Sequence, residues 1–509
     1  MLFNSYIFIL FFLPLSIIVY FLLNRYAYGK SGQAGLLWLF GMSLWFYGYE
    51  KPIYLILILS SIVVNFGLTH MMDGGKKRKK RQSLLLAAGL VFNLGLLFYF
   101  KYYNFFLENI YRTVGRDWEW KNIFLPLGIS FFTFQQVSFI IDCYKSKEGI
   151  HYSFIEYAAF VSFFPQLVAG PIVMHSQLVP QFRDKARKTI NYDNLAKGLY
   201  GFALGLGKKV LLADTLSKLV TAGFQNVGEL NSGSALTVML AYTLQIYFDF
   251  SGYSDMALGM AAMFNIELPI NFHSPYKAKT IGEFWERWHM TLTRFFTQYV
   301  YIPLGGSRKG KIRTYINTMT VFLLSGLWHG ANWTFVLWGG LHGALLTLEK
   351  IIRDIPRKKR TDRKQPEEGR GRPGNILKRG CSRALTFLFV NLAWVLFRAA
   401  SLEEAGLFIH KLLSGGFAIS GKLLEPMEKL IEVRLLARLG LGGLFEQYPF
   451  IPPAAILLLL LSGVFLMKNT QEKMAEDRYR LGRSLVTIIL LIWCIISLSD
   501  VSEFLYFNF

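Results

Sequence analysis

The chain has 509 residues, of which 53% are hydrophobic and 16% aromatic, whereas Asp, Glu, Lys and Arg together make up 17%. Soluble proteins contain about 25% charged residues, so this composition argues against a soluble globular protein, a disordered chain or a disulfide scaffold. The net charge is +22, but the basic residues cluster in loops between apolar segments and no aromatic platform accompanies them. Nucleic acid is therefore not an expected partner.

Ten apolar segments have about the length that an α-helix needs to cross a bilayer, which is roughly 20 residues. They occupy residues 3–23, 34–49, 52–70, 84–106, 123–143, 195–224, 235–263, 383–400, 453–467 and 484–499. The first has no basic segment before it and no small-residue cleavage site after it, so we interpret it as a retained helix and not as a signal peptide. The expected fold class is an all-α polytopic membrane protein in a single transmembrane domain over residues 1–509.

The basic loops predict how the chain is oriented in the membrane. Residues 76–81 carry six positive charges, and residues 353–379 carry eleven Lys or Arg against four Asp or Glu. Short basic loops mark the cytoplasmic side and attract anionic lipid head groups. With residues 76–81 inside, every later basic loop falls inside as well, and both termini lie outside. We therefore expect a basic cytoplasmic linker at 353–379 and C-terminal helices over 383–509.

Two segments do not fit simple crossing helices. Residues 155–173 contain Pro165 and the pair Gly170-Pro171, which predict a kinked or re-entrant segment. Residues 281–301 predict one amphipathic helix that lies at the interface or lines a polar cavity. The aromatic face of this helix consists of residues at helical spacing, namely Trp285, Trp288, Leu292, Phe296 and Tyr299.

A third segment, residues 315–350, is bounded by basic loops on both sides and must therefore enter the bilayer and return. Its first arm, 315–328, would reach only about 21 Å into a bilayer core about 30 Å thick, at about 1.5 Å per residue. The turn at 326–332 would place His329 at the tip of a buried hairpin. The flanking glycines are expected to leave room for a substrate to approach the imidazole.

Four histidines lie in apolar surroundings, where an ionisable side chain is costly and suggests a function. For His329 the alternative is a packing histidine bonded to a carbonyl, and for His289 it is an interfacial residue bonded to lipid or water. His342 is better explained by a hydrogen bond between helices, and His273 by a loop. The remaining four lie near loops or helix ends, where a solvated side chain explains them: His70, His151, His175 and His410.

Neither the carboxylates nor the cysteines predict a metal site. Asp249 and Asp255 begin an apolar helix, and six residues turn a helix through about 600°, which leaves the two side chains about 120° apart. We therefore favour structural salt bridges or hydrogen bonds for them. The three cysteines form no CxxC pair. Walker loop and HExxH motifs are absent from the sequence.

Three long motifs in consecutive order resemble the signature core of the membrane-bound O-acyltransferases, in the bacterial branch of the alginate O-acetyltransferases. They are YFDFSGYSDMALGMAAMFNIELPINFHSPY, FWERWHMTLTRFFTQYVYIPLGG and LLSGLWHGANWTFVLWGGLHG. Similarity extends over about residues 120–405, with the catalytic core at about 120–350. The resemblance implies a funnel-shaped helical bundle in which the WHG histidine, His329, acts within the membrane. It also implies that the RWH histidine, His289, is a second functional position.

The resemblance implies transfer of an acyl group to a hydroxyl of a polysaccharide or another envelope glycan. Such a transfer needs a base or a relay nucleophile, together with donors for the developing oxyanion. We assign His329 as general base or direct acyl acceptor, and His289 as a residue that orients or assists it. Further candidates for substrate binding are Trp285, Trp288, Asn271, Trp328, Asn332 and Trp333.

The expected acyl donor is acetyl-CoA from the cytoplasm, because Arg and Lys bind phosphate well and four of them gather between the two histidine motifs. These residues are Arg308, Lys309, Lys311 and Arg313, and a purely topogenic loop is an equal alternative. The outward loops are short, so we expect a separate extracytoplasmic acyltransferase partner to modify the glycan. A bacterial cytoplasmic membrane is the expected location.

Two other classes of function remain open at this point. An envelope D-alanyltransferase of the same superfamily would use an acyl carrier protein in place of acetyl-CoA. A secondary transporter or flippase would also bury histidines, but it is expected to contain an inverted internal repeat, and none is evident in the sequence.

Overall fold

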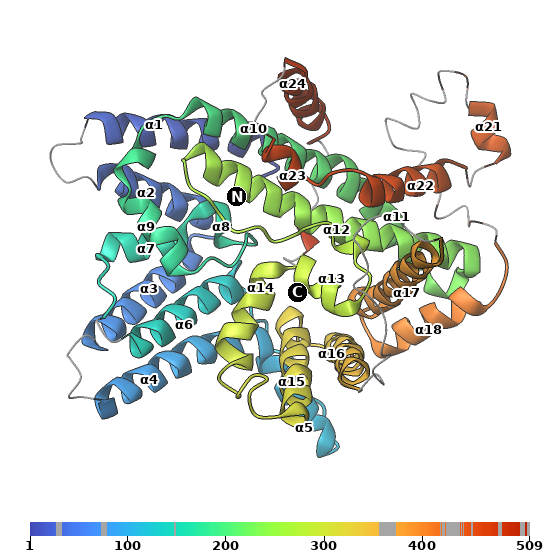
Figure 1. The fold of residues 1–509 in the computed structure, drawn as a ribbon, viewed down its shortest axis with the longest axis horizontal. Helices are drawn as coiled ribbons and strands as arrows, with labels where there is room; N and C mark the ends of the chain where they lie inside the picture. The colour runs from blue at the N-terminus through green and yellow to red at the C-terminus, as the bar shows by residue number, and fades with distance from the viewer. Residues whose placement is uncertain are drawn as a thin grey trace, which may run out of the picture. The chain divides into compact units, whose positions relative to one another are not determined.

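The computed structural model describes residues 1–26, 33–72, 79–146, 149–355, 373–417, 442–448, 451–476 and 481–498, together with residues 419, 423, 438, 440, 504 and 505. Throughout these residues the chain is built from α-, π- and 3₁₀-helices joined by loops, with no strand (Figure 1). This confirms the predicted all-α fold class. Residues 356–372 of the predicted basic linker lie outside the described residues.

The described chain forms two compact units. The first comprises residues 1–212, 248–271 and 470–509, and the second comprises residues 213–247 and 272–469. The long helix α12 (Ser232–Met263) contributes residues to both. The two histidine motifs of the sequence lie in the second unit. The single domain expected from the sequence stays a prediction.

The first unit begins with a π-helical turn, η1, and contains most of the N-terminal helices. Its elements are η1 (Phe8–Phe12), α1 (Leu13–Tyr26), α2 (Ala34–Gly48), α3 (Ile53–Met72), α4 (Lys79–Leu97), η3 (Phe98–Tyr102), α5 (Tyr103–Thr113), α6 (Ile129–Lys145), α7 (Phe154–Ser162), α8 (Phe164–Leu167), α9 (His175–Arg183), η4 (Lys185–Lys188), α10 (Tyr192–Gly207), α23 (Thr470–Met474) and α24 (Leu481–Ile496). The π-helix η5 (Lys208–Ala213) follows α10 directly.

The second unit contains most of the elements between residues 213 and 469. Its elements are α11 (Asp214–Gln225), η6 (Val227–Glu229), η7 (Pro275–Lys277), α13 (Ile281–Arg287), α14 (Met290–Phe296), η8 (Thr297–Tyr301), α15 (Lys311–His329), α16 (Trp333–Asp354), α17 (Pro373–Arg398), α18 (Leu402–Leu413), α21 (Gly442–Gln447) and α22 (Ile451–Leu466). All ten apolar segments predicted from the sequence fall on helices of the two units.

Five helical stretches of the described residues are long and apolar enough to cross a membrane. They are Phe8–Tyr26, Ile53–Met72, Lys79–Thr113, Trp333–Asp354 and Lys378–Arg398. Shorter apolar helices cover Ala34–Gly48, Pro453–Leu466 and Leu481–Ile496. The predicted segment 123–143 begins later than expected, at Ile129, because Gly128 precedes it with φ +69°, a left-handed conformation that stops helix growth in the N-terminal direction.

The segment predicted to be kinked is broken into two helices. Helix α7 ends at Ser162, Phe163 leaves the helical region with ψ 106°, and α8 covers only Phe164–Leu167. Pro165 stands near the start of α8, where its missing N–H costs no helical hydrogen bond. The break predicted from the prolines is therefore confirmed, and the residues around it are buried.

The two aspartates of α12 form ion pairs, as the sequence predicted. Lys209 Nζ lies 2.6 Å from Asp249 Oδ1, and Lys208 Nζ lies 2.6 Å from Asp255 Oδ2. The backbone N–H of Leu505 also donates to Asp249, at 2.9 Å. Both lysines come from the start of the π-helix η5. These carboxylates hold helices of the first unit together and do not form an acid–base pair.

Candidate functional site

Helices α15 and α16 form the predicted hairpin, and His329 is the last residue of α15. Gly330 then turns into an extended conformation, and Asn332 caps α16 by accepting a hydrogen bond from Thr334 N at 3.0 Å. The position of the turn is confirmed. The first arm is longer than predicted, because α15 already begins at Lys311, and its 19 residues rise about 28 Å.

The glycines beside His329 let the hairpin close, and they do not leave the open space that the sequence suggested. A Cβ atom added to Gly326 would lie 2.3 Å from Phe335 O, and one added to Gly339 would lie 2.3 Å from Phe322 O. At Gly330 an added Cβ would lie 2.1 Å from the ring of Phe335. Since real Cβ atoms do not approach so closely, these glycines allow the close contact between α15 and α16.

The segment 281–301 is not the single amphipathic helix that the spacing predicted. Helix α13 ends at Arg287, Trp288 is extended, and His289 adopts a left-handed conformation with φ +45° before α14 begins at Met290. A positive φ is uncommon for a residue other than glycine and is a typical feature of functional sites. The helical spacing of the aromatic residues hid this break, because the residues on either side continue a 3.6-residue pattern.

The imidazoles of His289 and His329 lie side by side within the second unit. Their ring centroids are 6.4 Å apart, and the two residues are 0% and 2% exposed. Trp328 lies against both, with its ring centroid 4.9 Å from His329 and 5.9 Å from His289. Trp338 contacts His329 from the other arm of the hairpin, at 5.2 Å. Burial lowers the pKa of His289, so its imidazole is neutral near pH 7.

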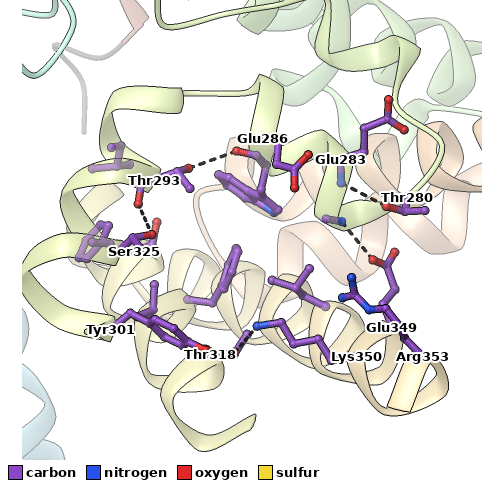
Figure 2. Close-up of a pocket in the computed structure, with 18 of the residues that line it drawn as sticks. Thr280, Glu283, Glu286, Thr293, Tyr301, Thr318, Ser325, Glu349, Lys350 and Arg353 are labelled. Atoms are coloured by element: carbon purple, nitrogen blue, oxygen red, sulfur yellow. Dashed lines mark hydrogen bonds between the residues drawn. The ribbon is translucent and has the colours of Figure 1, made fainter. Parts of the chain in front are cut away.

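A cavity of about 740 Å³ lies between α13, α14 and η8 on one side and α15 and α16 on the other. Figure 2 shows Lys350 of α16 at Thr318 of α15, with its ammonium donating to Thr318 Oγ1 at 2.7 Å, and Arg353 of α16 beside Glu349. The Glu349 carboxylate accepts the backbone N–H groups of Ile281 and Gly282 at 2.7 and 3.1 Å. This carboxylate therefore anchors the start of α13 to α16.

The cavity extends along α15 towards the two histidines. Ser325 lines it and lies one helical turn, or about 6 Å, before His329. Leu292 also lines it, three residues after His289, and so does Trp285, four residues before. The wall thus carries two cations, Lys350 and Arg353, together with three carboxylates, those of Glu283, Glu286 and Glu349. Another region of the wall comes within a turn of the paired imidazoles, although neither histidine itself lines the cavity.

The structure separates the four predicted donor-binding cations from the cavity. All are exposed, in or just after the loop between η8 and α15, and none lines the cavity: Arg308, Lys309, Lys311 and Arg313. The loop is shaped by Asn317, which is 1% exposed and donates its amide to Gly306 O at 3.0 Å. Sequence reasoning missed Lys350, Arg353 and Ser325. The appearance of Lys350 and Arg353 three residues apart at the end of an apolar helix was a signal that could have identified them.

The six predicted substrate-binding residues occupy different surroundings. Trp285 lines the cavity and Trp328 contacts both histidines, whereas Trp288 is buried against Phe272 at 4.9 Å. The Asn332 side chain is engaged at both ends, since its amide also donates to Ala400 O at 2.9 Å. Trp333 is 51% exposed. Asn271 is buried and belongs to the first unit.

The remaining histidines follow their predictions with one exception. The helix-to-helix hydrogen bond expected for His342 is confirmed, because Trp285 Nε1 donates to His342 Nδ1 at 3.2 Å. His273 lies in a loop, as predicted. The solvated side chain expected for His175 is wrong: this residue is 5% exposed, with Tyr152 Oη at 2.8 Å and Asp142 Oδ2 at 3.2 Å. His70, His151 and His410 are exposed, as predicted.

Comparison with known proteins identifies the family of this chain. The family model of the membrane-bound O-acyltransferases matches residues 97–366. Over its whole length the chain is 38% identical to a peptidoglycan O-acetyltransferase of Helicobacter pylori, 98% of which is covered. It is 36% identical to the probable alginate O-acetylase AlgI of Pseudomonas aeruginosa, over 82% of this chain and 75% of that protein.

A more distant relative is the teichoic acid D-alanyltransferase of Streptococcus thermophilus, which is 28% identical over 53% of this chain and 68% of its own length. In the part of the chain that the structure describes, no group of three or more His, Cys, Asp or Glu residues is arranged to hold a metal ion. The family model and the full-length relatives confirm the resemblance seen in the motifs. The chain therefore belongs to the membrane-bound O-acyltransferase family, as a multi-pass membrane enzyme of the alginate O-acetylase-like branch.

Proposed function

We propose that this enzyme takes an acetyl group from a thioester donor held in the cavity beside α15 and passes it on for O-acetylation of an extracytoplasmic polysaccharide or cell-envelope glycan. The observation that carries the proposal is the course of the cavity, from Lys350 and Arg353 to within one helical turn of His289 and His329. The relatives named as peptidoglycan and alginate O-acetylating enzymes support the same chemistry.

His329 acts as general base or as direct acceptor of the acyl group. As a base, its neutral imidazole takes the proton from the acceptor hydroxyl, the new C–O bond forms, the C–S bond of the thioester breaks, and the proton reaches the leaving thiolate. As a direct acceptor, a ring nitrogen attacks the thioester carbonyl, the C–S bond breaks, and the thiol leaves with the proton of the imidazole. The acceptor hydroxyl then attacks the acyl group, the N–C bond breaks, and the imidazole takes up the hydroxyl proton. His289, 6.4 Å away, orients or assists His329 in both routes.

Acetyl-CoA is the donor that we propose for this cavity, in which Lys350 and Arg353 lie beside the carboxylates of Glu283, Glu286 and Glu349. Its phosphates would lie at Lys350 and Arg353, because these cations line the cavity, while the exposed residues of the 308–313 loop would attract it from solution. The pantetheine arm would follow the apolar wall, which includes Val321, Phe322 and Leu346. The thioester would then lie near Ser325, one turn from His329.

The proposed orientation places the basic loops and the donor in the cytoplasm, and both termini outside, in a bacterial cytoplasmic membrane. Cys381 offers a direct test, because it is exposed near the start of the apolar part of α17. A membrane-impermeant thiol reagent is expected to label Cys381 in inverted vesicles and not in intact cells, with Cys381→Ser as the control. Labelling in intact cells would contradict the orientation.

We further propose that a separate extracytoplasmic acyltransferase receives the acetyl group and modifies the glycan. Helix α18 is a candidate for its contact surface. Its Ala405 and Phe408 are buried, whereas Leu402, Leu407 and Leu413 are 45%, 43% and 80% exposed. The chain reconstituted in liposomes with acetyl-CoA and a soluble glycan tests this step, since efficient acetylation of the glycan without another protein would make the partner unnecessary.

The second candidate is transfer of a D-alanyl group from an acyl carrier protein, which the teichoic acid D-alanyltransferase relatives favour. Purified chain in lipid nanodiscs separates the candidates when it is incubated with radiolabelled acetyl-CoA or with an acylated carrier protein. Loss of label from acetyl-CoA by the wild type but not by His329→Ala is the expected result, with the exposed His70→Ala as a matched control. Strict dependence on the carrier protein would contradict the acetyl-CoA proposal.

A further inference from the structure

His342 is a buried imidazole next to the proposed site that the mechanism does not use. It is 0% exposed, and its Nδ1 accepts the indole N–H of Trp285 at 3.2 Å. A neutral imidazole has one donor and one acceptor nitrogen, so Nε2 carries the proton when Nδ1 accepts. Nε2 makes no hydrogen bond among the described residues, so the bond to Trp285 is the one that orients this ring.

The imidazole of His342 is also held by the aromatic rings around it. Trp338 lies one helical turn earlier on α16, with its ring centroid 4.9 Å away, and Phe389 of α17 lies at 5.1 Å. The ring of Trp285 approaches edge to face, at 5.2 Å and 84°. Because aromatic rings from α13, α16 and α17 pack around His342, its imidazole is held in place and Nδ1 stays directed at Trp285.

Trp285 connects this acceptor to the cavity and to the strained turn at His289. Its side chain lines the cavity and packs edge to face on Phe322, another lining residue, at 5.1 Å. Its backbone carbonyl accepts the hydroxyl of Thr293 at 3.3 Å, which joins the end of α13 to α14 across the turn. The indole is therefore one wall of the donor cavity, four residues before His289.

His342 does not lie where it could act on the reacting atoms. It does not line the cavity, and the ring of Trp338 contacts both His342 and His329, at 4.9 and 5.2 Å. An effect of His342 on the reaction has to pass through a neighbouring ring, and Trp285 is the one that both lines the cavity and is hydrogen-bonded to His342. A buried indole N–H without an acceptor is unfavourable, so loss of the acceptor would turn the indole towards another partner and alter the cavity wall.

We infer that His342 is a positioning residue for acyl transfer, which fixes the indole of Trp285 and thereby the donor cavity beside His289. This inference rests on the proposed function, in which the cavity holds acetyl-CoA. It predicts that the bond between Trp285 and His342 affects binding of the donor more than turnover at saturation.

The test is a double-mutant cycle measured as KM for acetyl-CoA in nanodiscs. His342→Phe keeps a ring but removes the acceptor, and Trp285→Phe removes the donor. We expect each to raise KM about tenfold, the effect of a lost buried hydrogen bond, with a smaller change in kcat. We expect the double variant to resemble the single variants, because both remove one interaction. Additive effects on KM would overturn the inference, and so would an unchanged KM in His342→Phe.

Two further variants separate positioning from folding. His342→Asn retains a carbonyl oxygen near the place of Nδ1 and is expected to restore KM to within about threefold of the wild type. Trp38→Phe loses an indole hydrogen bond of similar length, to Ser16 O at 3.1 Å in the first unit, and is expected to leave KM unchanged. If His342→Phe does not fold, the pair Trp285→Phe and His342→Asn decides, since a tenfold rise in both would overturn the inference. A wild type without acetyl-CoA turnover would instead contradict the proposed function.

Discussion

Two buried groups of ionisable side chains in this chain, one in each unit, differ in how they are surrounded. In the first unit, Lys209 and Asp249 are 3% and 1% exposed, and they neutralise each other at 2.6 Å. In the second unit, His289 and His329 are as deeply buried, and aromatic rings such as that of Trp328 lie against them. A paired charge ties helices together, whereas a neutral imidazole keeps a lone pair that can accept a proton or an acyl group.

The largest effect that this comparison predicts is the loss of acetyl transfer when His329 is replaced. His329→Ala removes the base or acyl acceptor, and we expect acetyl transfer to fall by a factor of about 10² to 10⁴. The thermal midpoint is expected to change little in comparison. Transfer is measured with radiolabelled acetyl-CoA on purified protein, and His273→Ala in the neighbouring loop is the control. Wild-type transfer by His329→Ala would contradict its assignment.

For the ion pair of the first unit we expect substitution to lower stability and to leave activity largely unchanged. Asp249→Ala leaves the buried ammonium of Lys209 without its carboxylate, which costs about 3–5 kcal/mol of stability. Activity per folded molecule is expected to remain. Chemical unfolding in detergent measures the loss, and the double variant Asp249→Leu/Lys209→Met is expected to recover most of it. A fully stable but inactive Asp249→Ala would instead place this pair in the reaction.

The sequence predicted the parts of the site that depend on helical periodicity and on residues that interrupt helices. The turn after His329 was predictable because Gly330 and Asn332 interrupt an apolar run, and a bonded His342 was predictable from its place within an apolar helix. The break at His289 was not, since only the tertiary structure forces a non-glycine residue to φ +45°.

The cavity was only partly predictable for a related reason. The cations that line it, Lys350 and Arg353, come from the end of α16. The sequence drew attention instead to the denser cluster of charge at 308–313. Charge density in a sequence identifies a loop, but a cavity depends on which helices pack together. The same limit explains His175, which lies at the start of a short helix and is buried by contact with Tyr152 and Asp142 of other segments.

A smaller effect, on stability, distinguishes the role of the His289 backbone from that of its imidazole. His289→Ala and His289→Gly both remove the ring, so both are expected to slow acetyl transfer to the same degree. Glycine adopts φ +45° without the clash of a Cβ atom, so His289→Gly is expected to be more stable than His289→Ala by about 1 kcal/mol. Unfolding midpoints and transfer rates of the two variants provide the measurement. Equal stability would show that the turn is not strained.

The smallest expected effect distinguishes the two groups of cations. Lys350 lines the cavity and is partly buried, whereas Arg308 is exposed on the loop. Exposed charges are screened over about 8 Å at physiological ionic strength, and partly buried charges are screened less. We therefore expect Lys350→Met to raise KM for acetyl-CoA several-fold at low and high salt alike, while the smaller rise in Arg308→Met disappears as salt is added.

Lys350→Arg is the matched control for this pair, because it keeps the charge and is expected to retain a KM near that of the wild type. If Arg308→Met instead produced the larger and salt-independent rise, the phosphates would bind at the loop, as the charge pattern of the sequence first indicated. The cavity would then hold only the apolar arm of the donor. Measuring both variants over a range of salt therefore decides where the phosphates of the donor bind. They bind either at Lys350 in the cavity or at the exposed loop that carries Arg308.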